Sequence, residues 1–329
     1  MNYRVLITDH PAATVDVERA VFDTAGVEMV VAESTDPATL AALAADVDAI
    51  ATCFAKVPAA VLDNAPRCRT VARFGVGVDN IDVARAGELG IVVTNVPVYC
   101  VDEVADHTLM LLLALARRLV SFAADTAAGS WNRGFAPVPI RLRGKTFGII
   151  GVGAIGSALI PRVAALGMDV LALRRRGGEV EGATAVSSLD ELLTAADVVS
   201  LHLPLNAATR HLIGARELGL MKPTALLLNT SRGGLVDTAA LTAALSEGRL
   251  AGAGLDVTEP EPLPADHALR RMDNAVLTPH YAFSSDGSTA DLSRAAAQHV
   301  LDVLAGRRPD SIVNPEVLTS PALRTPELA

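Results

Sequence analysis

Two hydrophobic patterns alternate along the chain. Short runs of apolar, often β-branched residues are typical of buried parallel strands, and the alanine-rich segments between them have helical spacing. Before residue 100 the predicted strands are 5–8, 29–32, 49–52, 70–74 and 91–94, and the predicted helices are 15–25, 37–45, 58–64 and 81–89. Such alternation predicts a parallel sheet with helices on both faces.

A second series of the same kind follows residue 146. A helical pattern over 101–124, with Asp102 as its expected N-cap, leads into it. After it, a helix over 288–304 is expected to end at Gly306, and the tail from Pro309 to pack on the first unit or to fray. The predicted strands of the second series are 147–150, 168–173, 198–203, 225–229, 251–256 and 275–277, with helices 155–166, 188–195, 215–220 and 238–246.

Length and composition narrow the class of protein. The 329 residues exceed the roughly 250–300 at which single cores stop growing, which favours two domains. With 28 basic and 37 acidic residues the net charge is −9, which argues against a nucleic-acid or anionic-membrane surface. Three cysteines, Cys53, Cys68 and Cys100, share no metal-ligand spacing, so we expect reduced buried thiols in a cytoplasmic protein. The N-terminus is interpreted as a strand, and the longest apolar run, 109–116, is too short to span a bilayer.

A glycine-punctuated turn separates an apolar run from a helical one. Gly151, Gly153 and Gly156 have the G-x-G-x-x-G spacing of a dinucleotide-binding loop. The first glycine permits the turn, the second lets the backbone approach a pyrophosphate, and the third lets helix and strand pack closely. Glycines at this spacing also occur in ordinary turns, but the flanking strand and helix favour a dinucleotide, whose phosphates would meet the helix N-terminus.

Two further segments attract attention. The loop 73–82 follows a predicted strand, and its glycines Gly75 and Gly77 either expose N–H groups to a ligand or only shape a turn. The segment 129–143 has no clear period and carries Trp131, the only tryptophan. We interpret this segment as an oligomer contact or, equally, as packing at the domain junction.

Six motifs follow one another along the chain: RFGVGVDNID (73–82), GVGAIG (151–156), LHLPL (201–205) with TRHLI (209–213), NTSRGG (229–234), LDVTEPEP (255–262) and TPH (278–280). Together they resemble the D-isomer-specific 2-hydroxyacid dehydrogenase family, which includes glyoxylate/hydroxypyruvate reductases, phosphoglycerate dehydrogenases, phosphite dehydrogenase and C-terminal-binding-protein corepressors. The resemblance implies an α/β fold of two doubly wound parallel-sheet domains. Residues 1–100 and 285–329 would form a flavodoxin-like substrate domain, and residues 101–284 an inserted Rossmann dinucleotide-binding domain. The segment 95–106 looks closest to the corepressor-like branch.

Arg232, Glu261 and His280 match the family's catalytic arginine, glutamate and histidine, and each follows a predicted strand. A planar guanidinium suits gripping the carboxylate of a 2-keto acid and polarising its ketone. A histidine that titrates near neutral pH suits general acid in reduction and base in oxidation, and Glu261 would orient it. Taken singly, Arg232 could be a surface charge, Glu261 part of a solvated turn and His280 a hydrogen-bonded histidine of the core. Their family order favours the catalytic interpretation.

The resemblance also implies binding residues. The substrate carboxylate would meet N–H groups around Val76 and Gly77, with Arg73 nearby, and Phe283 would narrow the pocket. Ala154 replaces an arginine of many relatives, which puts one phosphate contact in doubt, and Asp256 lies near the nicotinamide or caps a turn. The remaining histidines have no metal-ligand spacing, so no metal is expected. The cofactor-binding residues implied are Gly151, Gly153, Ala154, Ile155, Gly156, Leu203, Pro204, Thr209, Thr230, Ser231 and Asp256.

A basic run at the end of the second Rossmann strand bears on the choice of cofactor. An acidic residue there would accept hydrogen bonds from the ribose of NAD, but Asp169 begins this strand and Arg174, Arg175 and Arg176 follow its end. Guanidiniums would attract a 2′-phosphate, so we predict NADP(H), with NAD(H) possible. An exposed basic loop indifferent to the cofactor is the alternative.

These observations predict an NADP(H)-dependent reductase of small 2-keto acids of the glyoxylate or hydroxypyruvate type, working as a homodimer by family resemblance. One alternative is a corepressor-like scaffold that senses dinucleotide without turnover, since such corepressors keep the same Arg–Glu–His set. Phosphite oxidation is a further alternative within the family, although the motifs do not single it out.

Overall fold

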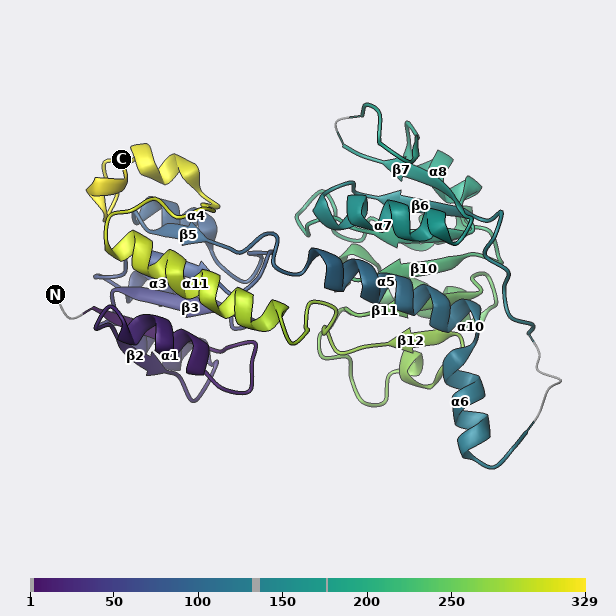
Figure 1. Cartoon of the computed structure of the whole chain (residues 1–329), viewed down its shortest axis with the longest axis horizontal. Coiled ribbons are helices and arrows are strands. Elements are labelled where there is room, and N and C mark those ends of the chain that lie inside the picture. The colour runs from purple at the N-terminus through teal and green to yellow at the C-terminus, as the bar shows by residue number, and fades with distance from the viewer. Residues whose placement is uncertain (1–2, 132–136, 176) are drawn as a thin grey trace. The chain divides into compact units, whose positions relative to one another are not determined.

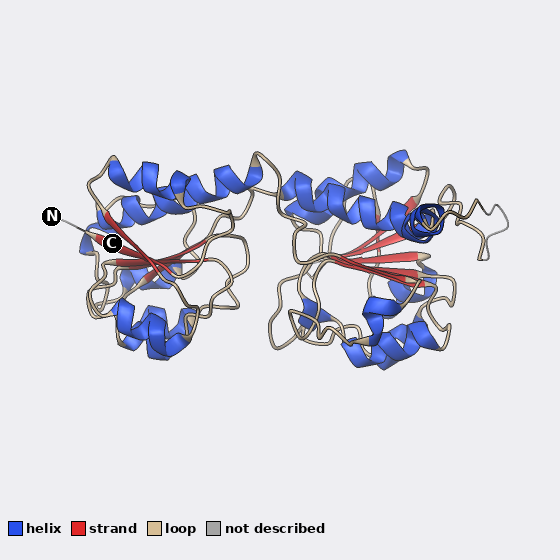
Figure 2. Cartoon of the chain, turned by 90° about the horizontal axis from the view of Figure 1, so that it is seen from below, coloured by secondary structure: helices blue, strands red, loops and turns tan. Residues whose placement is uncertain are grey.

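The computed structural model describes residues 3–131, 137–175 and 177–329, which form two compact units (Figure 1). The first unit comprises Met1–Tyr99 and Ser285–Ala329, and the second comprises Cys100–Ser284. In each unit, helices flank a sheet of parallel strands on both faces (Figure 2). The α/β fold class with two parallel-sheet domains, predicted from the alternating patterns, is confirmed.

The sheet of the first unit has the order β2-β1-β3-β4-β5, and every pair in it is parallel. This is the flavodoxin-like order, whose binding loops lie beyond the carboxyl ends of the strands. β3 and β4 are buried along their whole length, as expected of continuous apolar runs covered on both sides. The strands are β1 (Arg4–Ile7), β2 (Glu28–Val31), β3 (Ala49–Thr52), β4 (Thr70–Arg73) and β5 (Val92–Thr94).

Each face of this sheet has its own core. Leu6 and Ile50 pack with α2, α3 and α4, whereas Val5 and Ala49 pack with α1 and α11. The covering helix α11 follows the second unit in sequence, so the first unit is complete only when the chain returns to it. The helices are α1 (Asp16–Asp23), α2 (Pro37–Ala44), α3 (Ala59–Asp63), α4 (Val83–Glu88) and α11 (Ser288–Leu304), with short 3-10 helices η3 (Pro315–Thr319) and η4 (Pro326–Leu328).

The C-terminal tail packs on the first unit. The Asn314 side chain accepts a hydrogen bond from Val93 N at 2.8 Å and donates one to Ile91 O at 3.0 Å. Arg324 donates to the carbonyls of Ala65 and Cys68 at 2.7 and 2.8 Å. Of the two outcomes expected for the tail, packing is therefore the one observed.

The sheet of the second unit has the order β12-β11-β10-β9-β6-β7-β8, and all of its pairs are parallel. Counted from β6, this is the Rossmann order, which reverses direction between β6 and β9. Ligands bind outside the carboxyl ends of the strands at such a reversal. The strands are β6 (Thr146–Ile150), β7 (Asp169–Leu173), β8 (Thr184–Ala185), β9 (Val198–Leu201), β10 (Leu226–Asn229), β11 (Gly252–Leu255) and β12 (Ala275–Leu277).

Helices of the second unit also divide between the two faces. α5 and α7 pack on the core around Phe147 and Leu228, and α8, α9 and α10 pack on the core around Val199 and Leu227. The helices are α5 (Val101–Ala116), α6 (Leu119–Ala127), α7 (Ala154–Ala165), α8 (Leu189–Ala195), α9 (Ala215–Leu220) and α10 (Thr238–Ser246), with 3-10 helices η1 (Gly233–Leu235) and η2 (Ala268–Arg271).

The single helix predicted over 101–124 is wrong, because two helices, α5 and α6, meet there at a bend of 63°. Ile140 N donates a hydrogen bond to Ala116 O at 2.8 Å. In a continuous helix that carbonyl would accept from the N–H group of residue 120. Arg118 has a φ of 52° and turns the chain. Asp102 is not the N-cap, which is Cys100, but lies in the first turn, where Arg162 donates to it at 2.6 Å.

No single helix of the described residues is both long enough and apolar enough to cross a bilayer. By length and composition alone, α5 and α6 would pass that test as a bent pair.

Candidate active site

The glycine turn after β6 is built for a close approach. Gly151 has a φ of 96°, and a Cβ there would lie 2.2 Å from the carbonyl oxygen of His202. A Cβ on Gly156 would lie 2.3 Å from the carbonyl oxygen of Gly151, so helix α7 could not pack on the turn. Gly153 is the N-cap of α7, with open space around it and no capping side chain. Ala154 and Ile155 open the helix, so their N–H groups remain for an anion, which fits a dinucleotide phosphate.

The end of β7 lies next to this turn, because Gly151 N donates to Leu173 O at 2.9 Å. The exposed residues Arg174 and Arg175 follow directly, and the Arg174 guanidinium donates to Glu179 O at 3.3 Å. Arg176 lies outside the described residues. Asp169 starts the strand at its opposite end, so its position cannot serve a ribose beyond the carboxyl end.

Hydrogen bonds of two hydroxyl groups hold the loops after β9 and β10. Thr209 Oγ1 donates to Pro204 O at 2.7 Å and accepts from Asn206 N at 2.9 Å, which closes the loop that begins at Leu203. Ser231 Oγ donates to Leu201 O at 2.7 Å, so the two loops are joined at the end of β9. Leu203, Pro204, Thr209, Thr230 and Ser231 thus all lie near the carboxyl edge of the second unit's sheet.

The Arg232 loop is fixed from two sides. Asn229, fully buried at the end of β10, accepts from Ser231 N at 3.1 Å and donates to Arg232 O at 2.8 Å. A Cβ on Gly233 would lie only 1.9 Å from Thr258 O, so this loop lies directly on the loop after β11. The half-buried Arg232 side chain has one guanidinium nitrogen 2.8 Å from Ser231 O.

Glu261 and His280 meet in space across nineteen residues of sequence. His280 Nδ1 lies 2.5 Å from Glu261 Oε1, and Glu261 Oε2 accepts from Thr258 N at 3.3 Å. Because a carboxylate only accepts, the proton in the His280 contact belongs to Nδ1, and Nε2 is the ring nitrogen that points away from Glu261. His280 has a φ of 54°, in the left-handed region that non-glycine residues rarely adopt.

The conformation of the His280 loop is organised by Asp256, whose side chain is only 1% exposed. Its carboxylate accepts from Thr278 Oγ1 at 2.6 Å and from the N–H groups of Tyr281 and Ala282, both at 2.9 Å. Its carbonyl accepts from His280 N at 2.7 Å. These bonds hold the turn after β12, and the place of Asp256 near the nicotinamide stays a prediction.

The first unit contributes its own glycine loop at the end of β4. Arg73 is only 7% exposed, and its guanidinium lies 5.8 Å from the centre of the Phe54 ring. A Cβ on Gly75 would lie 1.9 Å from an Arg73 guanidinium nitrogen, so the side chain runs beneath the loop. Above it Val76 is exposed and Gly77 partly exposed, and Asn95 donates to Val76 O at 2.6 Å.

Two acidic residues that the sequence analysis did not single out, Glu259 in the second unit and Asp9 in the first, hold loops at the carboxyl ends of strands. Glu259 pairs with Arg210 at 2.7 Å and with His211 at 2.8 Å; the hydrogen bond from His211 and that from Arg210 hold the pKa of Glu259 below its usual value. In the first unit, Asp9 accepts from the N–H groups of Cys53, Phe54 and Ala55 at 2.8, 2.6 and 3.1 Å. Only the position of Asp9, just after a strand, could have identified it beforehand.

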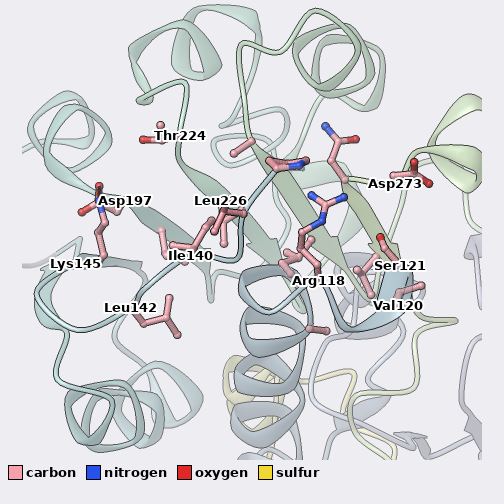
Figure 3. Close-up of a pocket in the computed structure, with 18 of the residues that line it drawn as sticks. Arg118, Val120, Ser121, Ile140, Leu142, Lys145, Asp197, Thr224, Leu226 and Asp273 are labelled. Carbon is pink, nitrogen blue, oxygen red and sulfur yellow. Dashed lines mark hydrogen bonds and ion pairs between the residues drawn. The ribbon is translucent and has the colours of Figure 1, made fainter. Parts of the chain in front are cut away.

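Two features of the described residues bear on ligands. Among them, no group of three or more His, Cys, Asp or Glu side chains could hold a metal ion. A cavity of about 370 Å³ lies away from the catalytic loops, at the amino ends of β9, β10 and β12, where Arg118, Lys145 and Asp197 line it together with apolar residues (Figure 3). The cavity is therefore distinct from the carboxyl edge where the catalytic loops gather.

Comparison with known proteins identifies the family. The sequence profile described as D-isomer specific 2-hydroxyacid dehydrogenase, NAD binding domain, matches residues 109–282. The glyoxylate reductase of Thermococcus litoralis is 41% identical over 285 residues, which are 84% of this chain and 86% of that protein. The glyoxylate reductase of Aeropyrum pernix is 42% identical over 290 residues, or 85% and 87% of the two chains.

A solved structure agrees with these sequence relatives. The NADPH-dependent glyoxylate/hydroxypyruvate reductase from Sinorhizobium meliloti, in complex with NADP and malonate, superposes with a TM-score of 0.87 at 34% identity. The match covers 95% of this chain and 97% of that one. The resemblance inferred from six motifs is confirmed, and the chain belongs to the D-isomer-specific 2-hydroxyacid dehydrogenase family.

Proposed function

We propose that the protein reduces a small 2-keto acid to the 2-hydroxy acid with a hydride from a nicotinamide dinucleotide. The observation that carries this is the 2.5 Å contact between His280 and Glu261, on the same sheet edge as the Arg232 loop in a Rossmann-ordered unit. The glyoxylate reductase relatives support a 2-keto acid as the substrate. A bound nicotinamide supplies the hydride, and this chain's residues bind the acid and handle its proton.

Arg232 binds the acid and polarises the ketone. Its loop is held by Asn229 and by the close approach of Gly233 to Thr258, so the guanidinium starts from a fixed backbone. A planar guanidinium can contact a carboxylate and a carbonyl oxygen together, and it favours the negative charge that develops on that oxygen.

His280 donates the proton that the oxygen needs as it becomes an alkoxide. Glu261 holds the Nδ1–H, which directs Nε2 away from the carboxylate. In the direction of oxidation the same nitrogen takes the proton from the hydroxyl group. The N–H groups of Val76 and Gly77 remain our proposal for the substrate carboxylate, and Phe283 for the residue that limits substrate size.

The test is the initial rate of NADPH and NADH oxidation against glyoxylate, hydroxypyruvate, pyruvate, phenylpyruvate and oxaloacetate. Rapid turnover of glyoxylate or hydroxypyruvate is expected, and Arg232→Lys, which keeps the charge but loses the planar fork, should raise KM and lower kcat. Binding of NADPH without turnover of any acid would overturn the proposal and favour the dinucleotide-sensing scaffold.

We infer a preference for NADP(H) from Arg174 and Arg175. Both are exposed beyond the end of β7, next to the Gly151 turn, where a Rossmann unit receives the adenosine ribose. Replacing them together by Asp and Ser should shift the ratio of kcat/KM toward NADH, because a carboxylate repels a 2′-phosphate. An unchanged preference for NADPH would contradict the assignment. Arg19→Asp, which replaces an exposed arginine of α1 in the first unit, is the control for a change of charge away from the β7 end and should leave the preference unchanged.

We also propose that a second copy of the chain covers the cavity of Figure 3. Helix α6 and the chain that follows it carry four large, strongly exposed apolar side chains: Leu119 (59%), Val120 (55%), Trp131 (78%) and Val138 (77%). Val120 and Val138 also line the cavity, so exposed apolar side chains lie at its rim. A face of that kind can pair with its own copy about a twofold axis.

Sedimentation velocity tests the dimer. The wild type should sediment as a dimer, and Val120→Asp with Val138→Asp as a monomer. Val98→Asp alters a valine of the first unit whose exposed fraction (69%) lies between those of Val120 and Val138, and this variant should stay dimeric. A monomeric wild type would refute the proposal. The three cysteines are buried and form no disulfide within the described residues, which supports a reducing compartment such as the cytoplasm.

A further inference from the structure

Helix α5 contacts both catalytic loops through two consecutive residues. His107 Nε2 lies 2.9 Å from Thr278 Oγ1, and Thr108 Oγ1 lies 2.9 Å from Thr230 Oγ1. Thr278 comes two residues before His280, and Thr230 comes two residues before Arg232. One rigid helix thus anchors the start of each loop that carries a proposed catalytic residue.

The direction of the first contact follows from the protons available. Thr278 Oγ1 donates its single proton to Asp256 Oδ1 at 2.6 Å, so it must accept from His107. The proton on the His107 ring is therefore on Nε2, which also lies 3.5 Å from Asp256 Oδ1. The side chain of His107 is 16% exposed and lies against a carboxylate that is almost completely enclosed.

This chain of hydrogen bonds ends on the main chain around His280. The same Asp256 carboxylate accepts from the N–H groups of Tyr281 and Ala282. His280 itself has a φ of 54°, a conformation that persists only where the surroundings hold it. His107 therefore acts on the backbone that aims the His280 ring at Glu261, without touching the ring.

The second contact has a fixed direction as well. Thr108 Oγ1 donates its proton to Val104 O at 2.7 Å, so it accepts the proton of Thr230. Both threonines are buried, Thr108 completely. The bond therefore fixes the start of the segment in which Asn229 and Ser231 orient Arg232.

We propose that His107 and Thr108 are positioning residues that hold the His280 loop and the Arg232 loop in register on α5. The proposal rests on the function proposed above, since it assumes that Arg232 and His280 act on the substrate. If the two contacts served only to pack the helix on the sheet, their loss would lower the stability of the unit. It would not lower kcat in one variant and raise KM in the other.

The variants separate the hydrogen bonds from side-chain volume. His107→Leu removes the donor, whereas His107→Gln keeps an N–H donor on a side chain of similar length and cannot titrate. Thr108→Val removes the hydroxyl with little change of shape, and Thr108→Ser keeps it. Steady-state kinetics with NADPH and glyoxylate, thermal unfolding and NMR spectra of the full-length protein labelled with ¹⁵N-histidine are the measurements.

We expect His107→Leu to lower kcat by about tenfold, the upper end of what one hydrogen bond contributes, with KM for the acid nearly unchanged. The Nδ1–H resonance of His280 should move in the same variant. His107→Gln should restore both readouts. Thr108→Val should instead raise KM for the keto acid by about fivefold or more, through Arg232, and Thr108→Ser should restore it.

Failure of this inference is distinguishable from failure of the proposed function. If the wild type turns over glyoxylate and His280→Ala does not, but His107→Leu keeps a normal kcat and an unmoved His280 resonance, the positioning role is refuted. If the wild type reduces no acid, the proposed function fails, and the His280 resonance still decides whether His107 positions the ring. If His107→Leu unfolds, His107→Gln decides: a folded protein with lowered kcat would contradict the hydrogen-bond role.

Discussion

Replacing Gly233 by alanine tests whether the Arg232 loop must lie on the loop of Glu261. An added Cβ would lie 1.9 Å from Thr258 O, 2.1 Å from Thr258 C and 2.8 Å from Glu259 N. All three are backbone atoms, so no side chain can rotate away. Ordinary contact begins at 3.4 Å, and the difference of 3.4 − 1.9 Å means that the loops must separate by about 1.5 Å.

Such a separation should be felt in catalysis more than in cofactor binding. A misplacement of about 1 Å costs roughly a hundredfold in rate, so kcat/KM for the keto acid should fall at least that far. Overpacking should also lower the free energy of unfolding by about 1–3 kcal/mol. NADPH affinity, measured by fluorescence titration, should fall less than kcat/KM, because the Gly151 turn follows a different strand and only Thr230 and Ser231 of the proposed cofactor contacts lie in the displaced loop.

Gly219→Ala is the matched control for this experiment. It is the same substitution in the same unit, on helix α9, where nothing lies within 4 Å of the added Cβ and alanine is favoured by about 1 kcal/mol. Its kcat/KM should equal that of the wild type. A Gly233→Ala variant as active as Gly219→Ala would refute the claim that the close approach positions Arg232.

Three further predictions concern buried groups. Burial raises the pKa of Cys53 and of Cys68 to about 12, so both thiols stay protonated at pH 8 and should react with a disulfide reagent only after unfolding; fast reaction in the native state would contradict this. Burial lowers the pKa of His202 to about 4, whereas an unfolded histidine titrates near 6.5, so the unfolded state takes up the proton first and stability falls from about pH 6.5 toward pH 4. His202→Gln should flatten that part of the pH profile of urea unfolding. Glu18 is completely buried and its carboxylate has no hydrogen-bond partner within the described part of the chain, so Glu18→Met should raise the free energy of unfolding by about 1–3 kcal/mol, and a loss of stability would show an overlooked partner.

The order of elements was predictable because it depends on local patterns. A buried parallel strand is a continuous apolar run, and a binding loop follows its carboxyl end, so β10, β11 and β12 could be predicted together with Arg232, Glu261 and His280. The glycine turn was predictable because its glycine spacing follows a strand in the sequence. The structure gives the reason for the glycines, since Gly151 and Gly156 have no room for a Cβ.

Contacts between distant segments were not predictable. The break between α5 and α6 depends on Ile140 taking the Ala116 carbonyl, and no residue near 116 signals it. The bond from His107 to Thr278 spans 171 residues, and in the sequence His107 is only a histidine within a helical pattern. Asp256 was assigned through the family alone, whereas its bonds depend on how the segment after β12 folds over it.

The most direct test of the central claim is pre-steady-state oxidation of NADPH by the wild type and by His280→Ala with glyoxylate or hydroxypyruvate. The account predicts that the variant binds NADPH normally, since His280 lies beyond β12 and away from the Gly151 turn, but transfers hydride about 10²–10⁴ times more slowly without its general acid. A variant with a nearly normal rate would contradict the assignment of His280, and with it the mechanism proposed for this protein.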